Sequence, residues 1–96
     1  MLKVFKYDIS INDYFTVNLP QGAQVLKVEE QYGKPQLWAL VDPNAPQGER
    51  TFRFVGTGHP INDAIEQLKF INTFQMKNGA LIFHIFEVIN AFGDNN

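Results

Sequence analysis

The sequence contains no cysteine and only two histidines, His59 and His84, among its 96 residues. Without cysteine the chain has no disulfide framework, no thiolate nucleophile and no cysteine-based zinc or iron–sulfur site. The two histidines are far apart in the sequence, so they share neither one helix turn nor alternate positions of one strand. We therefore expect no metal site and no bound cofactor.

Side chains suited to catalysis are also scarce. The single serine, Ser10, falls in a predicted turn without neighbouring glycines, and none of the four threonines lies in a recognisable nucleophile elbow. Glu29 and Glu30 are adjacent, so on a strand they point to opposite faces and cannot share a proton. The sequence predicts a protein that is not an enzyme, and only convergence of His59 with His84 in space would favour catalysis.

Long apolar runs and an excess of positive charge are missing as well. Residues 1–10 alternate charged with apolar side chains, unlike a signal peptide, and no later segment approaches the length of a membrane span. Eight basic and ten acidic side chains give a net charge of −2, which provides no general attraction for nucleic acid. We expect a cytosolic protein that binds neither membranes nor nucleic acids in general.

The composition that remains is that of a small globular domain. With 45% hydrophobic residues and nine phenylalanines, a chain of 96 residues can form one domain with one core. We assign that domain to residues 1–92. Residues 93–96 are polar and show no periodicity, and we expect them to be a disordered tail.

Alternation of apolar and polar residues, interrupted by turn residues, repeats about seven times along the chain. In the third of these segments Leu26 and Val28 are expected to face inward, and residues 33–35 to turn the chain back. Asn-Gly at 78–79 predicts a type I′ turn between the last two strands, because these residues tolerate positive φ angles. The predicted strands are residues 5–9, 15–19, 24–31, 36–41, 50–55, 69–76 and 80–88.

Helical spacing occurs in one segment, residues 61–68, where Ile61, Ala64, Ile65 and Leu68 recur on one side. Two helical turns are too short to be stable without packing against the rest of the protein. The fold predicted from all segments is mostly β: a seven-stranded antiparallel sandwich or partly closed barrel, with this short helix before a C-terminal hairpin.

The strongest candidate for a ligand site is the segment Gly-Thr-Gly-His-Pro-Ile at 56–61. Gly56 and Gly58 allow the backbone to approach a ligand, and Thr57 and His59 offer hydrogen-bonding groups. Arg53, on the strand that leads to this segment, could supply a bidentate guanidinium to an anion. The plainer interpretation is a tight turn beside an ordinary solvated arginine.

A second candidate surface is apolar. Strands 36–41 and 80–88 are apolar on both faces, and a chain this short has little material to cover both, which favours a homo-oligomer. Within them, Trp38 is more typical of a core residue and His84 of a hydrogen-bonded structural histidine. The residues predicted to form a partner interface are Trp38, Asp42, His84 and Phe86.

Four sequence blocks resemble an uncharacterised family of small proteins encoded by bacteriophages and prophages. They are LPQGA at 19–23, LWALVDP at 37–43, GTGHPI at 56–61 and GALIFH at 79–84. The resemblance covers nearly the whole chain, although Phe92 lies beyond it. It implies a small accessory protein that acts in the cytoplasm of a bacterial host.

Three functions remain open from the sequence. The first is a protein that binds and inhibits or sequesters a component of the host, such as a defence protein. The second is a sponge for an anionic, nucleotide-like small molecule held at the 56–60 loop. The third is a small structural component of the virion.

Overall fold

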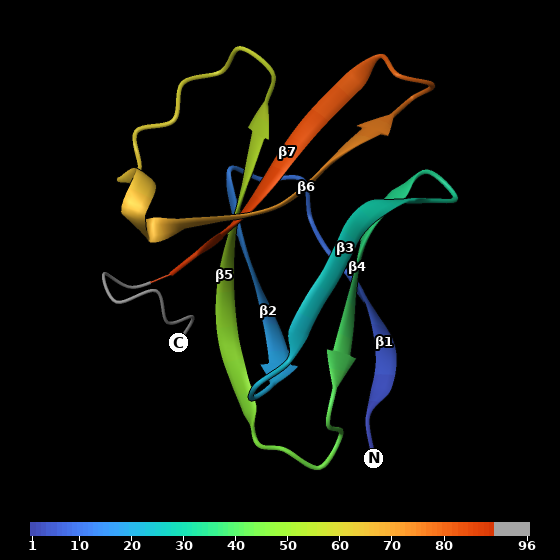
Figure 1. The fold of residues 1–96 in the computed structure, drawn as a ribbon. Helices are drawn as coiled ribbons and strands as arrows, with labels where there is room; N and C mark the ends of the chain where they lie inside the picture. The colour runs from blue at the N-terminus through green and yellow to red at the C-terminus, as the bar shows by residue number, and fades with distance from the viewer. Residues whose placement is uncertain (90–96) are drawn as a thin grey trace.

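Seven strands form the framework of the protein in a computed structural model, which describes residues 1–89. They lie in two antiparallel sheets, with strand orders β1-β4-β3 and β2-β5-β7-β6 (Figure 1). The expected tail at 93–96 and Phe92 lie outside the described residues. The strands are β1 (Lys3–Asp8), β2 (Tyr14–Pro20), β3 (Gln24–Gln31), β4 (Lys34–Val41), β5 (Gln47–Gly56), β6 (Leu68–Met76) and β7 (Leu81–Val88).

The two sheets face each other in a sandwich and do not close into a barrel. Side chains alternate between the two faces of a strand, so each strand contributes every second residue to the core. Leu37 and Ala39 of β4 are fully buried in one hydrophobic cluster with Phe52 of β5 and Ile85 of β7. Burial of each large side chain of this kind contributes roughly 1.5–3 kcal/mol, which makes this double layer the main source of stability. The predicted sandwich of seven antiparallel strands is confirmed.

One side of the sandwich is held together by a side-chain amide. Asn72 of β6 donates from Nδ2 to the Val28 carbonyl oxygen at 2.7 Å, and its Oδ1 accepts from the Val28 N–H at 2.8 Å. A register shift between Phe70 and Asn72 in the β6–β7 ladder marks the same place. The amide of Asn72 thus takes the role of a strand backbone and joins β6 to the free edge of β3.

A buried ion pair crosses the inner face of the four-stranded sheet. Arg50 of β5 donates from Nε and Nη2 to the two carboxylate oxygens of Glu87 on β7, at 2.6 and 2.8 Å. A third bond runs from Arg50 Nη1 to the Ala23 carbonyl oxygen at 2.5 Å. The side chains are only 8% and 1% exposed, so both charges are shielded from water.

Three local predictions were wrong. Residues 61–68 do not form a helix, and the helical part of the segment is one 3-10 turn at Ile65–Gln67, because no inward stripe is packed against a neighbour. Leu26 is 45% exposed, since a bulge between Val25 and Lys27 removes it from the alternation. The turn expected at 33–35 lies one residue earlier, where Tyr32 and Gly33 have φ angles of 52° and 82°.

The last hairpin agrees with the prediction, with a small shift. The positive φ angles fall on Lys77, Asn78 and Gly79, and Gly79 N–H donates to the Met76 carbonyl oxygen at 3.2 Å. β5 begins at Gln47, three residues before the expected start at Arg50, which shortens the loop predicted at 42–48. Within residues 1–89, no helix is long and apolar enough to cross a membrane.

Candidate functional site

The loop between β5 and β6, residues 57–64, contributes side chains to two hollows on the surface. Arg53 fixes it from the outer face of β5: Nε donates to Asp63 Oδ1 at 3.2 Å, and Nη2 to the Pro60 carbonyl oxygen at 3.4 Å. Tyr14 lies directly opposite Arg53 in the β2–β5 ladder, and its hydroxyl donates to Asp63 Oδ2 at 2.5 Å. The guanidinium carbon is 5.0 Å from the centroid of the Tyr14 ring. Arg53, Asp63 and Tyr14 therefore clamp the loop onto the sheet.

The clamp changes the titration of its acid groups. The Tyr14 hydrogen bond, followed by the hydrogen bond and charge of Arg53, holds the pKa of Asp63 below its ordinary value, although burial opposes this. The same hydrogen bond to Asp63 raises the pKa of Tyr14, because it requires the hydroxyl proton. Both directions favour an ionised aspartate beside a neutral tyrosine.

One hollow lies at the end of the sandwich, beneath this loop, with a volume of about 410 Å³. Three predicted ligand residues, Arg53, Gly56 and His59, line it together. The His59 ring packs on Gly56 so closely that a Cβ there would be 2.9 Å from the ring, which explains a glycine at this position. Its other lining residues are Ile11, Asn12, Asp13, Phe54, Val55, Pro60, Asn62 and Phe83.

The charges around this end cavity are mixed. Besides its contacts with Asp63 and Pro60, Arg53 Nη1 donates to the Phe54 carbonyl oxygen at 2.8 Å and lies 3.7 Å from Asp13 Oδ1. The Asp13 side chain is 89% exposed, so it is a weakly held partner. An anion would therefore have to replace Asp13 at the guanidinium, whereas neutral ligands could use the polar rim directly.

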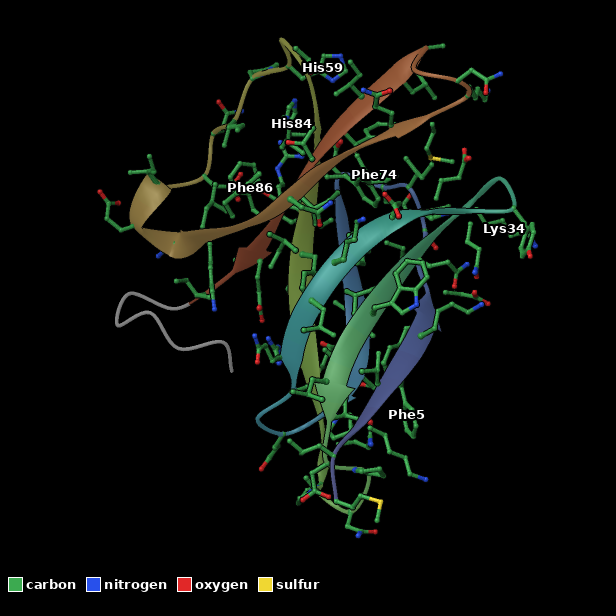
Figure 2. All side chains as sticks on the ribbon, turned by 45° about the vertical axis from the view of Figure 1, so that its right-hand side comes forward. Phe5, Lys34, His59, Phe74, His84 and Phe86 are labelled. Atoms are coloured by element: carbon green, nitrogen blue, oxygen red, sulfur yellow. The ribbon has the colours of Figure 1, made fainter. Side chains whose placement is uncertain are left out.

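Thr57, the fourth predicted ligand residue, turns away from this cavity. Its Oγ1 lies 2.7 Å from Nε2 of His84 on β7, and Thr73 Oγ1 lies 2.8 Å from the other ring nitrogen, Nδ1. Figure 2 shows His59 on the loop and His84 on the strand beside it; His59 packs on Gly56, whereas His84 binds the two threonines. Gly58 has a φ of +86°, which requires glycine to complete the turn.

The Thr57–His84 contact has the geometry of a hydroxyl beside a general base, but the third member differs from that of a hydrolase. Thr73 offers a neutral hydroxyl to His84 Nδ1, where a catalytic triad has a carboxylate that stabilises the imidazolium. Both ring nitrogens are occupied whichever tautomer is present. The network joins the 56–59 turn to β7 and β6, as expected for a structural histidine.

The second hollow is an apolar groove on the outer face of the four-stranded sheet, with a volume of about 420 Å³. Phe70 and Phe86 form its floor, with ring centroids 5.5 Å apart in an edge-to-face arrangement. The walls are exposed: Ile61 of the loop is 42% exposed and Ile65 of the 3-10 turn 79%. The floor is open as well, since Phe70 is 55% exposed. We call it the outer groove; its lining residues are Ile61, Asp63, Ile65, Leu68, Phe70 and Phe86.

The four residues predicted as a partner interface do not share one surface. Phe86 lies in the outer groove and His84 in the threonine network, both on the four-stranded sheet. Trp38 alternates with the buried Leu37 and Ala39, so it lies on the opposite outer face, on β4. Asp42 follows β4 and accepts a hydrogen bond from the Asn44 N–H at 3.0 Å, which stabilises the turn.

Thr73, Asp63 and Tyr14 were not predicted as site residues from the sequence. Thr73 could have been found, because a hairpin centred on the Asn-Gly turn at 78–79 puts Thr73 opposite His84, as the β6–β7 ladder does. Asp63 carries no such signal. It lies in an irregular loop whose path depends on the contacts with Arg53.

Among residues 1–89, no three His, Cys, Asp or Glu side chains are grouped so that they could hold a metal ion. Comparison with known proteins found no match among curated proteins and none among solved structures. One family, described as a domain of unknown function (DUF7352), matches residues 1–95. Because the match extends over nearly the entire sequence, the chain belongs to this family.

Proposed function

We propose that this chain is a non-enzymatic binding protein that recognises a protein of a bacterial host through the outer groove and thereby inhibits or sequesters it. The observation that carries the proposal is the apolar floor of Phe70 and Phe86 beneath a loop fixed by Arg53 and Asp63. A groove of about 420 Å³ has room for one or two large apolar side chains. Apolar anchors that fill such pockets provide most of the affinity at protein interfaces.

The exposure of the groove favours a protein over a small molecule as its ligand. Sites for small molecules bury roughly 70–90% of the ligand surface. Walls as exposed as Ile65, at 79%, cannot enclose a ligand to that extent. A protein partner covers such walls with its own surface. The resemblance to phage and prophage proteins favours a host protein as partner, with the host cytoplasm as the location.

Affinity capture from bacterial lysate tests this proposal when a groove variant accompanies the natural chain. Phe70→Asp places a charge in the groove at a position that is 55% exposed, so the fold should be retained. Tyr32→Asn, in the distant β3–β4 turn, is the matched control, because Tyr32 is 97% exposed and asparagine tolerates its positive φ.

We expect the natural chain and the Tyr32 variant to recover the same protein, and Phe70→Asp to lose it. With the purified partner, Phe70→Asp should weaken binding by at least about tenfold, the effect of removing an interface anchor. Equal capture by both variants, or no specific protein, would contradict the proposal. Detection of the chain in purified virions would instead support a structural role.

A second candidate function is the small-molecule sponge, which is favoured by the end cavity that Arg53, Gly56 and His59 share. An anionic ligand would replace Asp13, the exposed partner of Arg53. Thermal shift against a panel of nucleotides tests it, with Asp13→Asn as the informative variant. The sponge predicts a stronger response when Asp13 is neutralised, and no response in either protein would refute it.

A further inference from the structure

The outer face of the three-stranded sheet is a second uncovered surface, on the side opposite the outer groove. In Figure 2 this sheet lies in front, and no strand or loop of residues 1–89 crosses β1, β4 and β3. Trp38 and Leu40 are half-buried there, and Val4, opposite Leu40 in the β1–β4 ladder, is 55% exposed. Apolar side chains gathered on one sheet face favour a covering partner.

The ladders arrange the charges of this face in rows that run across the three strands. Antiparallel partners share a face, so the registers of β1 and β3 with β4 give the rows directly. One row is basic, with Lys6, Trp38 and Lys27. The adjacent row is acidic, with Asp8, Gln36 and Glu29. The two rows are two residues apart along each strand, or about 7 Å.

We propose that this face binds a second copy of the chain, related by a two-fold axis that runs parallel to the rows and midway between them. Such an axis places the basic row of one copy on the acidic row of the other. Lys6 then faces Asp8 of the second copy, and Lys27 faces Glu29. A symmetric interface repeats every contact, so four charge pairs form at once. The rule that like charges repel excludes a two-fold axis along the strands, because it would place Lys6 on Lys27.

A buried polar atom supports the same arrangement. The Gln36 side chain lies between these charges, and its Oε1 is buried without a hydrogen-bond donor among residues 1–89. An unsatisfied buried acceptor is destabilising and calls for an explanation. The proposed axis places Trp38 of the second copy over Gln36. On dimerisation the Gln36 amide turns outward and accepts from the indole N–H, a donor that needs an acceptor when it is buried.

The size of the face predicts a weak dimer. Three strands of up to eight residues cover about 15 Å by about 25 Å, a flat area of roughly 400 Å². A standard interface buries about 800 Å² on each partner, about twice this area. Two contacts within the chain must break before the intermolecular pairs form: Lys27 with Glu29 at 3.0 Å, and Lys6 with Gln31 at 2.6 Å. Both lie at the surface, so breaking them costs little free energy. We expect a dissociation constant of roughly 100 µM, increasing with salt.

Sedimentation equilibrium from about 1 µM to about 1 mM protein, at low and high salt, tests the proposal with charge variants. Lys6→Asp places a carboxylate opposite Asp8 of the second copy, twice in the symmetric dimer, and should weaken the dimer by about tenfold. The swap Lys6→Asp with Asp8→Lys reverses both members and should restore the affinity to within about threefold. Lys3→Glu, on the same strand but the other face, is the matched control and should change little.

Trp38→Phe keeps an apolar ring but removes the N–H, and should weaken the dimer severalfold. A monomer at every concentration would overturn the proposal, as would an unchanged dimer in Lys6→Asp. A tighter dimer in that variant would indicate the axis along the strands and also overturn it. These measurements use the chain alone and do not involve Phe70, so their outcome is independent of the outer groove.

Discussion

The buried pair of Arg50 and Glu87 permits a quantitative prediction about stability. Two hydrogen bonds of 2.6 and 2.8 Å join the charges, and Arg50 Nη1 also serves the Ala23 carbonyl oxygen. Removing one member of such a pair leaves the other charge buried without compensation, which typically costs about 3–5 kcal/mol. Domains of this size have a total unfolding free energy of about 5–15 kcal/mol. Glu87→Leu or Arg50→Met alone should therefore remove a large share of the stability.

The double variant Arg50→Met with Glu87→Leu should behave differently from the sum of its parts. Apolar replacement of a whole buried pair is often neutral or stabilising, because neither charge then needs to be desolvated. The Ala23 carbonyl oxygen loses its donor, at a cost of about 1–3 kcal/mol. We expect the unfolding free energy of the double variant to be within about 3 kcal/mol of that of the natural chain. If the two single effects added, the loss would instead be about 6–10 kcal/mol.

Urea unfolding monitored by circular dichroism measures all four proteins, at low micromolar concentration so that self-association does not contribute. Glu29→Gln is the control, since it removes an exposed partner of Lys27 and should cost less than about 1 kcal/mol. A loss under about 1 kcal/mol in either single variant would refute the dependence of the two buried charges on each other, as would single effects that add in the double variant. Additivity would mean that the charges do not depend on each other.

Two further predictions concern the contacts that fix the 57–64 loop and close the sandwich. The pKa of Asp63 is lowered in the folded chain, so the ionised carboxylate stabilises the fold. This contribution is complete above the ordinary carboxyl pKa near 4 and is lost as the pH falls through the lowered pKa. The difference in melting temperature between the natural chain and Tyr14→Phe should therefore shrink on acidification, and a difference that is constant down to pH 2 would contradict the clamp. Asn72→Leu leaves the Val28 N–H and carbonyl without their partner and should cost about 2–4 kcal/mol in urea unfolding, whereas a loss below about 1 kcal/mol would show that water replaces the amide.

Strand alternation in the sequence is sufficient to predict most of this fold, because one buried face per strand imposes a period of two. It predicted the last hairpin and the outward orientation of Arg53 between Phe52 and Phe54. The period fails where the backbone departs from it. At Leu26 a bulge inserts one residue, and no sequence feature of this strand marks the insertion.

The helix predicted at 61–68 fails for a related reason. Ile61 and Ile65 do recur at helical spacing, but in the folded chain they wall the outer groove, and neither is buried against the sheet. Isolated helices of two turns are unstable in water, so helical spacing without a packing partner does not produce a helix. The clamp of Arg53 on Asp63 then determines the path of the loop.

The alternation of side chains along β5 and β7 also indicates a buried ion pair, which considering each charged residue by itself did not predict. Arg50 shares the face of Phe52, and Glu87 shares the face of Ile85, so one basic and one acidic residue occupy core positions of neighbouring strands. A buried charge needs a partner of opposite sign, and these two supply each other. By contrast, the rows of charge on the outer face of β1, β4 and β3 emerge only when three strands are placed in register. Pairing of strands distant in the sequence is what turns scattered lysines and carboxylates into a self-complementary surface, and that pairing depends on the fold as a whole.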